Sequence, residues 1–149
     1  MIRAMTEGDL ESVLSIENAC FSDPWSRQGF EDSLKEASAH LIVIENETSD
    51  IVGYACLYQV IDEGEIVNVA IDPKYRQQGY GAKLVGALMD LGKELGATNF
   101  FLEVRKSNEA GRALYESLGF FECGIRKGFY DNPKEDAVLM MWEMANLSQ

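Results

Sequence analysis

Apolar residues in this chain recur with two spacings, one typical of helices and one typical of strands. Leucines spaced by three and four predict a helix over 82–95 that ends at Gly96. Shorter apolar runs bounded by turn-forming residues predict strands. The predicted strands cover 2–5, 40–45, 51–60, 65–71, 98–104, 120–126 and 137–143, and the leucines are Leu84, Leu88, Leu91 and Leu95.

Capping residues followed by apolar positions on one face predict three further helices. Thr6 and Ser26 are the expected N-caps of the first two, and Ser107 or Asn108 that of a helix over 108–118 ended by Gly119. The order of elements predicts one mixed α/β (α+β) layer domain over 1–149, with hairpins across 47–50 and 131–136 and fraying at 146–149. The expected inward residues are Leu10, Val13, Leu14, Phe30, Leu34, Ala110, Leu114 and Leu118.

A glycine-bearing segment, Arg-Gln-Gln-Gly-Tyr-Gly at 76–81, lies between the strand ending at Ile71 and the helix over 82–95. Backbone N–H groups are free at a helix start, and glycines let an anion approach them. The segment therefore predicts a cradle for the pyrophosphate of a cofactor. It is neither a P-loop nor a dinucleotide fingerprint, because Gly-Lys-Ser/Thr and Gly-x-Gly-x-x-Gly are absent. As bare loop geometry, the same turn is equally a structural connection.

The spacing Arg-x-x-Gly-x-Gly resembles the acetyl-coenzyme A signature of the GCN5-related N-acetyltransferase (GNAT) superfamily. A second block has the superfamily's order of strand, loop, tyrosine-bearing helix and Gly-Phe; it comprises Leu102–Arg105, Ser107–Ala110 and Ala113–Phe120. The resemblance implies the GNAT fold, with a mostly antiparallel sheet of about seven strands and about four helices. Its two central strands, here 65–71 and 98–104, would run parallel and splay apart.

Four segments narrow the resemblance to the ribosomal-protein-alanine N-acetyltransferase (RimI-like) subfamily, over roughly residues 1–144. They are Pro24–Ser26, Asn68–Ile71, Leu102–Asn108 and Gly124–Lys127. One departure is Gly128-Phe129-Tyr130, where the subfamily usually has Asn-Tyr-Tyr in the peptide groove. The resemblance implies an acetyl-CoA-dependent transferase, without a metal, that acetylates the N-terminal alanine of a small-subunit ribosomal protein.

Two catalytic roles follow from the resemblance. Glu103 would take the amine proton, directly or through water, and Tyr115 would protonate the coenzyme sulfur. From the residues alone, Glu103 could instead pair with Arg105 on the same strand face, and Tyr115 could be a partly buried tyrosine with one hydrogen bond. Glu65, on the other central strand, is a rival base.

The expected cofactor contacts fall on three segments. The backbone of Val69, Ala70 and Ile71 would hold the pantetheine arm as though it were an added strand. Asn108 would donate to the same arm, unless it only caps its helix. The phosphates would lie on Arg76, Gln77, Gln78, Gly79, Tyr80, Gly81 and Ala82, with positive charge from Lys74, Arg76 and Lys83, and Trp25 and Tyr130 would either wall a peptide groove or only pack.

The net charge of −12 disfavours direct nucleic-acid binding, which needs a basic face. It favours a cationic partner, such as the basic N-terminal segment of a ribosomal protein, or serves only solubility. An α-amine, with a pKa near 8, is roughly a few hundred times more often neutral than a lysine amine near 10.4, a difference of about 3 kcal/mol. We expect a cytoplasmic protein, a monomer or weak dimer, with no membrane contact.

The remaining reactive residue types predict little chemistry. Cys20, Cys56 and Cys123 are expected to be reduced thiols and small core residues, and the single histidine, His40, to be structural. Two other functions stay open. The acceptor could be another N-terminus, a lysine or a small-molecule amine, or the chain could be a noncatalytic acetyl-CoA-binding module, although Glu103 and Tyr115 argue mildly against the latter.

Overall fold

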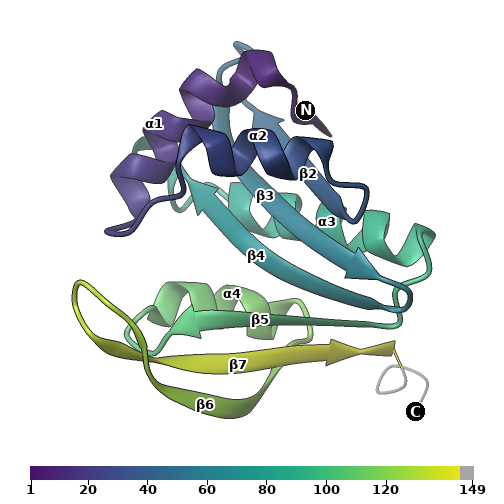
Figure 1. The fold of residues 1–149 in the computed structure, drawn as a ribbon, viewed down its shortest axis with the longest axis vertical. Helices are drawn as coiled ribbons and strands as arrows, with labels where there is room; N and C mark the ends of the chain where they lie inside the picture. The colour runs from purple at the N-terminus through teal and green to yellow at the C-terminus, as the bar shows by residue number, and fades with distance from the viewer. Residues whose placement is uncertain (145–149) are drawn as a thin grey trace.

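A computed structural model describes residues 1–144 and contains a seven-stranded sheet in the order β1-β2-β3-β4-β5-β7-β6. Helices lie on both faces of this sheet (Figure 1). The mixed fold with about seven strands and four α-helices is therefore confirmed. The elements are β1 (Ile2–Ala4), η1 (Glu7–Asp9), α1 (Leu10–Cys20), α2 (Arg27–Lys35), β2 (Ala39–Glu45), β3 (Ile51–Val60), β4 (Glu63–Ile71), η2 (Pro73–Tyr75), α3 (Tyr80–Glu94), β5 (Asn99–Arg105), α4 (Glu109–Ser117), β6 (Phe121–Tyr130) and β7 (Glu135–Glu143).

The central strands β4 and β5 run parallel, and they pair only from Glu63 opposite Asn99 to Ile66 opposite Leu102. A register shift in the β3–β4 ladder, where Cys56 faces Asn68 but Leu57 faces Ile66, bends β4 just beyond this point. Both strands continue past their shared register and diverge, so that a V opens toward their C-terminal ends (Figure 1). The predicted splayed pair is confirmed.

Two apolar cores lie on opposite faces of the sheet. One joins α3 and α4 to strand residues such as Leu102 and Val104, and the other joins α1 and α2 to β2, β3 and β4. Because side chains alternate along a strand, Glu103 faces away from the α3 and α4 core. In Figure 1, α1 and α2 cover the upper strands and leave β5, β7 and β6 uncovered on that face.

The predicted helix ends are largely confirmed. The Ser26 hydroxyl accepts from the backbone N–H of Gly29 at 3.1 Å, and Asn108 accepts from that of Gly111 at 2.9 Å. Gly96 and Gly119 follow their helices at φ +101° and +97°, which glycine adopts without strain. Thr6 forms a capping box, although with the 3₁₀ turn η1 that precedes α1.

Several predicted burials are wrong. Leu95 is 49% exposed because it follows the last turn of α3, and Ala110 is exposed in the first turn of α4, beyond the end of β5. The buried residue of α4 is instead Tyr115. Of the thiols, Cys56 is buried and Cys20 half-buried, whereas Cys123 is exposed on β6 at the sheet edge.

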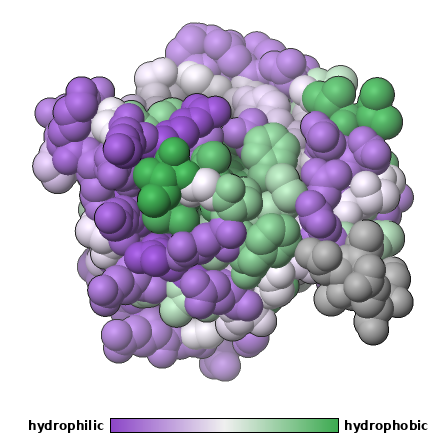
Figure 2. All heavy atoms as spheres, turned by 90° about the horizontal axis from the view of Figure 1, so that it is seen from below, coloured by the Kyte–Doolittle hydropathy of each residue, from purple (hydrophilic) through white to green (hydrophobic). Residues whose placement is uncertain are grey.

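β6 and β7 extend further into their connection than predicted, which leaves a loop over 131–134. Seen from below, hydrophilic side chains surround an apolar patch near the middle of this face, and a smaller apolar cluster lies at the upper right edge (Figure 2). Within 1–144, no helix is long and apolar enough to span a membrane. The fraying predicted for 146–149 lies outside the described residues.

Candidate active site

Glu103 lies on β5 just beyond the last residue that pairs with β4, so its side chain stands beside the opening of the V. Its side chain is 15% exposed, and Oε1 lies 3.5 Å from Nη1 of the largely exposed Arg126. The other oxygen, Oε2, is buried and has no hydrogen-bond partner among the described residues. A buried carboxylate oxygen without a partner is costly, and such atoms occur at reactive sites.

The alternative pairing of Glu103 with Arg105 is wrong. The Arg105 guanidinium contacts Glu135 at 3.2 Å and donates to the backbone carbonyls of Asp131 and Pro133. It also lies 4.5 Å above the ring of Tyr130. Arg105 therefore holds the loop after β6 in place, and the cationic group that contacts Glu103 is that of Arg126.

Glu65 lies on β4 on the same face, where it senses the charge of Glu103. Burial first, and then the negative charge of Glu103, raise the pKa of Glu65 above its ordinary value, while Arg126 opposes them. Two carboxylates and one guanidinium therefore share this part of the V. Arg126 was not singled out from the sequence, because its partner is 23 residues away and joins it only through the sheet.

Tyr115 approaches from the opposite face, on α4. It is almost completely buried, and burial, followed by the nearby Tyr130 phenol, raises the pKa of Tyr115 to about 12. Its ring packs edge-on against Phe120 with centroids 5.8 Å apart. Tyr115 is therefore protonated at neutral pH and able to donate a proton.

Tyr130 interacts electrostatically with both predicted catalytic groups. Burial and then the charge of Glu103 raise the pKa of Tyr130, and Tyr130 in turn affects Tyr115. The preceding Gly128 has φ +61°, a left-handed conformation that asparagine also tolerates. Replacing the subfamily's Asn by Gly128 is thus compatible with an unchanged backbone at this point.

The predicted phosphate cradle is the turn before α3. Gln77 and Gly79 have positive φ, and Gly79 is the N-cap of α3, so the first N–H groups of this 15-residue helix are free of helical partners. A Cβ on Gly79 would meet no protein atom within 4 Å. A Cβ on Gly81 would lie 3.2 Å from Leu114 Cδ2, so Gly81 lets α3 pack closely against α4.

The positive charges predicted around this turn are unevenly placed. Arg76 is drawn back to the end of β4, where its guanidinium donates to the Ile71 carbonyl at 3.3 Å and to Cys20 Sγ at 3.2 Å. Lys83 is exposed in the first turn of α3. Burial is the main cause that raises the pKa of the Cys20 thiol, with Arg76 opposing it.

The segment predicted to bind the pantetheine arm is a strand edge that has a neighbouring strand on one side only. Val69, Ala70 and Ile71 pair with β3 on one side, while their other side faces the V, because β5 pairs no further than Ile66. Asn108 uses Oδ1 for its helix cap, and Nδ2 makes no hydrogen bond with a described residue. Capping and donation to a ligand are therefore compatible.

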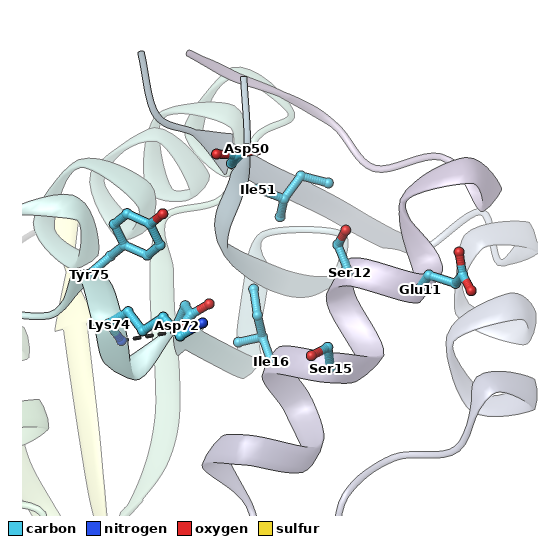
Figure 3. A pocket seen from close by; sticks show the side chains of 9 residues that line it. All are labelled: Glu11, Ser12, Ser15, Ile16, Asp50, Ile51, Asp72, Lys74 and Tyr75. Carbon is cyan, nitrogen blue, oxygen red and sulfur yellow. Dashed lines mark hydrogen bonds between the residues drawn. The ribbon is translucent and has the colours of Figure 1, made fainter. Parts of the chain in front are cut away.

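Figure 3 shows a separate hollow of about 390 Å³ between α1, the β2–β3 turn and the segment 72–75. Its side chains come from Glu11, Asp50, Asp72 and Lys74 among others, and Lys74 donates its backbone N–H to Asp72 at 3.0 Å. It contains neither Glu103 nor Tyr115, nor any residue of 76–82. The hollow is separate from the chemistry of the V.

A buried carboxylate that was not singled out from the sequence joins several elements on the face of the sheet that α1 and α2 cover. Glu17, on α1, is 1% exposed and accepts from the Tyr54 hydroxyl, from Asn68 Nδ2 at 3.0 Å and from the backbone N–H of Trp25 at 2.9 Å. It thus joins α1 to β3, to the bend of β4 and to the start of α2. The spacing Leu10-Val13-Leu14-Glu17 places a carboxylate on an apolar helix face and could have revealed it.

Two loops meet at the open end of the V. Asn132 Nδ2, in the β6–β7 loop, donates to Asp23 Oδ1, in the α1–α2 loop, at 3.0 Å. Both loops lie at the end of the molecule toward which β4 and β5 diverge (Figure 1). A splayed parallel pair of strands, a glycine turn with free N–H groups, and a carboxylate and a phenol on opposite faces of the sheet are together what an acyl-coenzyme A-dependent transferase requires.

The comparisons agree with this class. The model of the acetyltransferase (GNAT) family matches residues 10–120, and the chain belongs to that family. GNAT enzymes use acetyl-CoA as the acetyl donor.

Among the relatives of this chain is the ribosomal protein bS18-alanine N-acetyltransferase of Haemophilus influenzae, which is 40% identical over 89% of this chain and 90% of the relative. The enzyme of the same name from Escherichia coli K12 is 36% identical over 93% of this chain and 94% of the relative. The crystal structure of the Escherichia coli ribosomal-protein-S18-alanine N-acetyltransferase superposes with a TM-score of 0.88 at 33% identity, covering 97% of this chain and 93% of that one.

Proposed function

We propose that this chain is an acetyl-CoA-dependent N-α-acetyltransferase that acetylates the N-terminal alanine of a small-subunit ribosomal protein in the cytoplasm, with residues 1–149 as its single domain. The observation that carries the proposal is Oε2 of Glu103, which is buried at the opening of the V and has no hydrogen-bond partner within residues 1–144. The names of the relatives support the acceptor, because two of them are 36% and 40% identical over at least 89% of this chain.

The residues around the V fit acetyl-CoA. Open space beside Gly79 and free N–H groups at the start of α3 suit the phosphates, and Gln77 to Ala82 would hold them. The free edge of Val69 to Ile71 and Nδ2 of Asn108 would hold the pantetheine arm. Bound there, acetyl-CoA supplies the acetyl group as a thioester.

The chain's own groups then move two protons. Glu103 takes a proton from the acceptor ammonium and leaves a neutral amine, which is the nucleophilic form. The Tyr115 hydroxyl, whose pKa is raised to about 12, keeps its proton at neutral pH and gives it to the released sulfur. Glu103 and Tyr115 lie on opposite faces of the sheet. The V connects these faces, because β4 and β5 do not pair there.

An α-amine suits this site better than a lysine. At neutral pH the neutral form of an α-amine is roughly a few hundred times more abundant, which is worth about 3 kcal/mol before the enzyme contributes anything. The proposed base is a single carboxylate, Glu103, in weak contact with Arg126, so its power to remove a proton is limited. We therefore expect the acceptor to be the α-amine, because its deprotonation costs less free energy than that of a lysine amine.

Incubation with acetyl-CoA and a basic Ala-initiated peptide, read by mass spectrometry, tests the proposal. We expect one acetyl group on the terminal amine and none on a peptide whose N-terminus is blocked but which contains lysine. Faster transfer to polyamines or lysine would transfer the assignment to those acceptors. Binding of coenzyme A without transfer to any amine would identify a noncatalytic module instead.

A double variant, Glu103→Gln with Tyr115→Phe, tests the roles of the two groups. Turnover equal to that of the parent would remove both assignments, whatever the acceptor.

A further inference from the structure

A groove of about 430 Å³ runs along α2 and opens beside β3, apart from the chemistry at Glu103. Its walls combine two aromatic rings with two carboxylates and no Lys or Arg. The lining residues are Trp25, Ser26, Gly29, Asp32, Ser33, Glu36 and Tyr58.

Both aromatic walls are fixed in place. The backbone N–H of Trp25 donates to the buried Glu17, and its ring packs on Phe30 with centroids 5.3 Å apart. On the other wall, the Tyr58 hydroxyl and Ser33 Oγ share a hydrogen bond of 2.6 Å. The walls of the groove are therefore preformed by contacts within the protein.

The two carboxylates of the groove form no ion pair within the described part of the chain. Asp32 lies in the last turn of α2, and Glu36 is the extended C-cap residue that follows the helix. Asp32 accepts from Gln28 and Glu36 from Ser38, and neither forms an ion pair with a described cationic group. The groove therefore presents two negative charges together with two aromatic rings, and aromatic faces also attract cations.

The groove lies on the same face of the sheet as the acceptor site. Tyr58 is directly opposite Glu65 across β3 and β4, and Glu65 is opposite Phe101, two residues before Glu103. Neighbouring strands are about 4.8 Å apart, so β3 is about 10 Å from β5. An extended chain advances about 3.4 Å per residue, so about three residues span that distance.

We propose that this groove binds a guanidinium or ammonium side chain at about the third or fourth residue of the acceptor polypeptide. The proposal rests on the function proposed above and adds a sequence requirement beyond the terminal alanine. The aromatic rings contact the side-chain stem, while Asp32 and Glu36 contact the cationic group.

The test uses Ala-initiated peptides that carry a single Arg, or Gln in its place, at each of positions two to five. For the parent enzyme we expect KM to be about fivefold lower with Arg at position three or four, since two exposed ion pairs supply effects of this size. The variant Asp32→Asn with Glu36→Gln should lose that difference while kcat stays unchanged. Charge reversal to Lys at both positions should instead favour peptides with Glu.

The matched control is Asp90→Asn with Glu94→Gln, which removes two exposed charges from α3 on the other face of the sheet. It should keep the parent's preference for Arg. If the parent acetylates every peptide without a preference, or if the preference survives in the groove variant, the groove assignment is overturned and the proposed function stands. If the parent acetylates no peptide, both are overturned.

Discussion

Glu17 and Glu103 are two carboxylates in apolar surroundings, and their neighbours give them different tasks. Both oxygens of Glu17 accept hydrogen bonds, from Tyr54, Asn68 and the Trp25 backbone, so neither oxygen lacks a partner. One oxygen of Glu103 has only a 3.5 Å contact with Arg126, and the other has no partner among the described residues. The satisfied carboxylate braces the fold, while the unsatisfied one is free to take a proton.

Glu103→Gln should lower kcat about 10²- to 10⁴-fold, because removing a general base costs about this much, while KM for the peptide changes little. The amide keeps the size of the side chain, so the melting temperature should stay near that of the parent. Steady-state kinetics with Glu65→Gln as the matched control measures the difference. A larger loss of kcat in Glu65→Gln would make Glu65 the base.

A second carboxylate prediction concerns stability in acid. Asp9 receives both guanidinium nitrogens of Arg3, at 2.8 and 2.9 Å, together with the Thr6 N–H, and the Arg3 hydrogen bonds are the main cause that lowers the pKa of Asp9 from 3.8 to about 2. A depressed carboxyl pKa stabilises the fold above the unfolded value and is lost as pH falls through the folded one. Asp9 should contribute on the order of 2 kcal/mol at pH 6, and this contribution disappears between about pH 4 and pH 2.

Urea unfolding of Asp9→Asn at pH 6 and pH 2.5 measures this contribution. The variant should be less stable than the parent at pH 6, and more than half of this difference should be gone at pH 2.5, just above the folded pKa of about 2, whereas the exposed Asp90→Asn should follow the parent at both. A constant gap between Asp9→Asn and the parent across this range would contradict the ion pair as its source.

At the scale of elements, the two glycines of the turn before α3, Gly79 and Gly81, have different structural roles. Gly79 supplies the left-handed conformation that begins the helix, and its missing Cβ faces open space. Gly81 has an ordinary φ, and a Cβ there would press on Leu114 of α4. The first glycine keeps the cradle accessible, and the second brings α4, with Tyr115, close to the start of α3.

Gly79→Glu should abolish coenzyme A binding, because a negatively charged side chain would occupy the space proposed for the phosphates. The left-handed φ adds a cost in stability of about 1 kcal/mol for a residue with a Cβ. Calorimetric titration with coenzyme A measures the affinity. Gly86→Glu is the control, since it adds the same charge on the same helix, also in free space, and should bind as the parent does. Equal affinities in the two variants would contradict the cradle.

Local signals predicted the elements well, and long-range contacts account for what was missed. Ser26, Asn108 and Gly96 act within one turn of the chain, so their capping roles could be inferred from the sequence. On α4, Leu114 and Leu118 pack against the core as predicted, whereas Ala110 is exposed because it precedes the part of the helix that reaches the core. Arg126 and the Glu17 network depend on strand order and on neighbours up to 51 residues away, which spacing does not reveal.

At the scale of the whole molecule, the divergence of β4 and β5 connects the two faces of the sheet, as the proposed reaction requires. Glu103 belongs to the face that α1 and α2 only partly cover, and Tyr115 to the core of α3 and α4 (Figure 1). In a continuous sheet, strand backbone would separate them. The divergence beyond Ile66 and Leu102 removes that barrier, and the Asp23–Asn132 hydrogen bond joins the two loops at the open end.

The net charge of −12 belongs to the same scale and predicts a salt effect. A negative protein attracts a cationic peptide over several ångströms, and this attraction decays with a Debye length of about 10 Å at 0.1 M salt and about 3 Å at 1 M. We therefore expect kcat/KM for a peptide with several Arg residues to fall severalfold between about 0.05 and 0.5 M sodium chloride. For the same peptide with Gln in place of Arg, kcat/KM should change less than twofold, and kcat should stay constant for both. Equal falls for the two peptides would mean that salt acts on the enzyme itself or on its binding of acetyl-CoA, and that the acidic surface serves solubility alone.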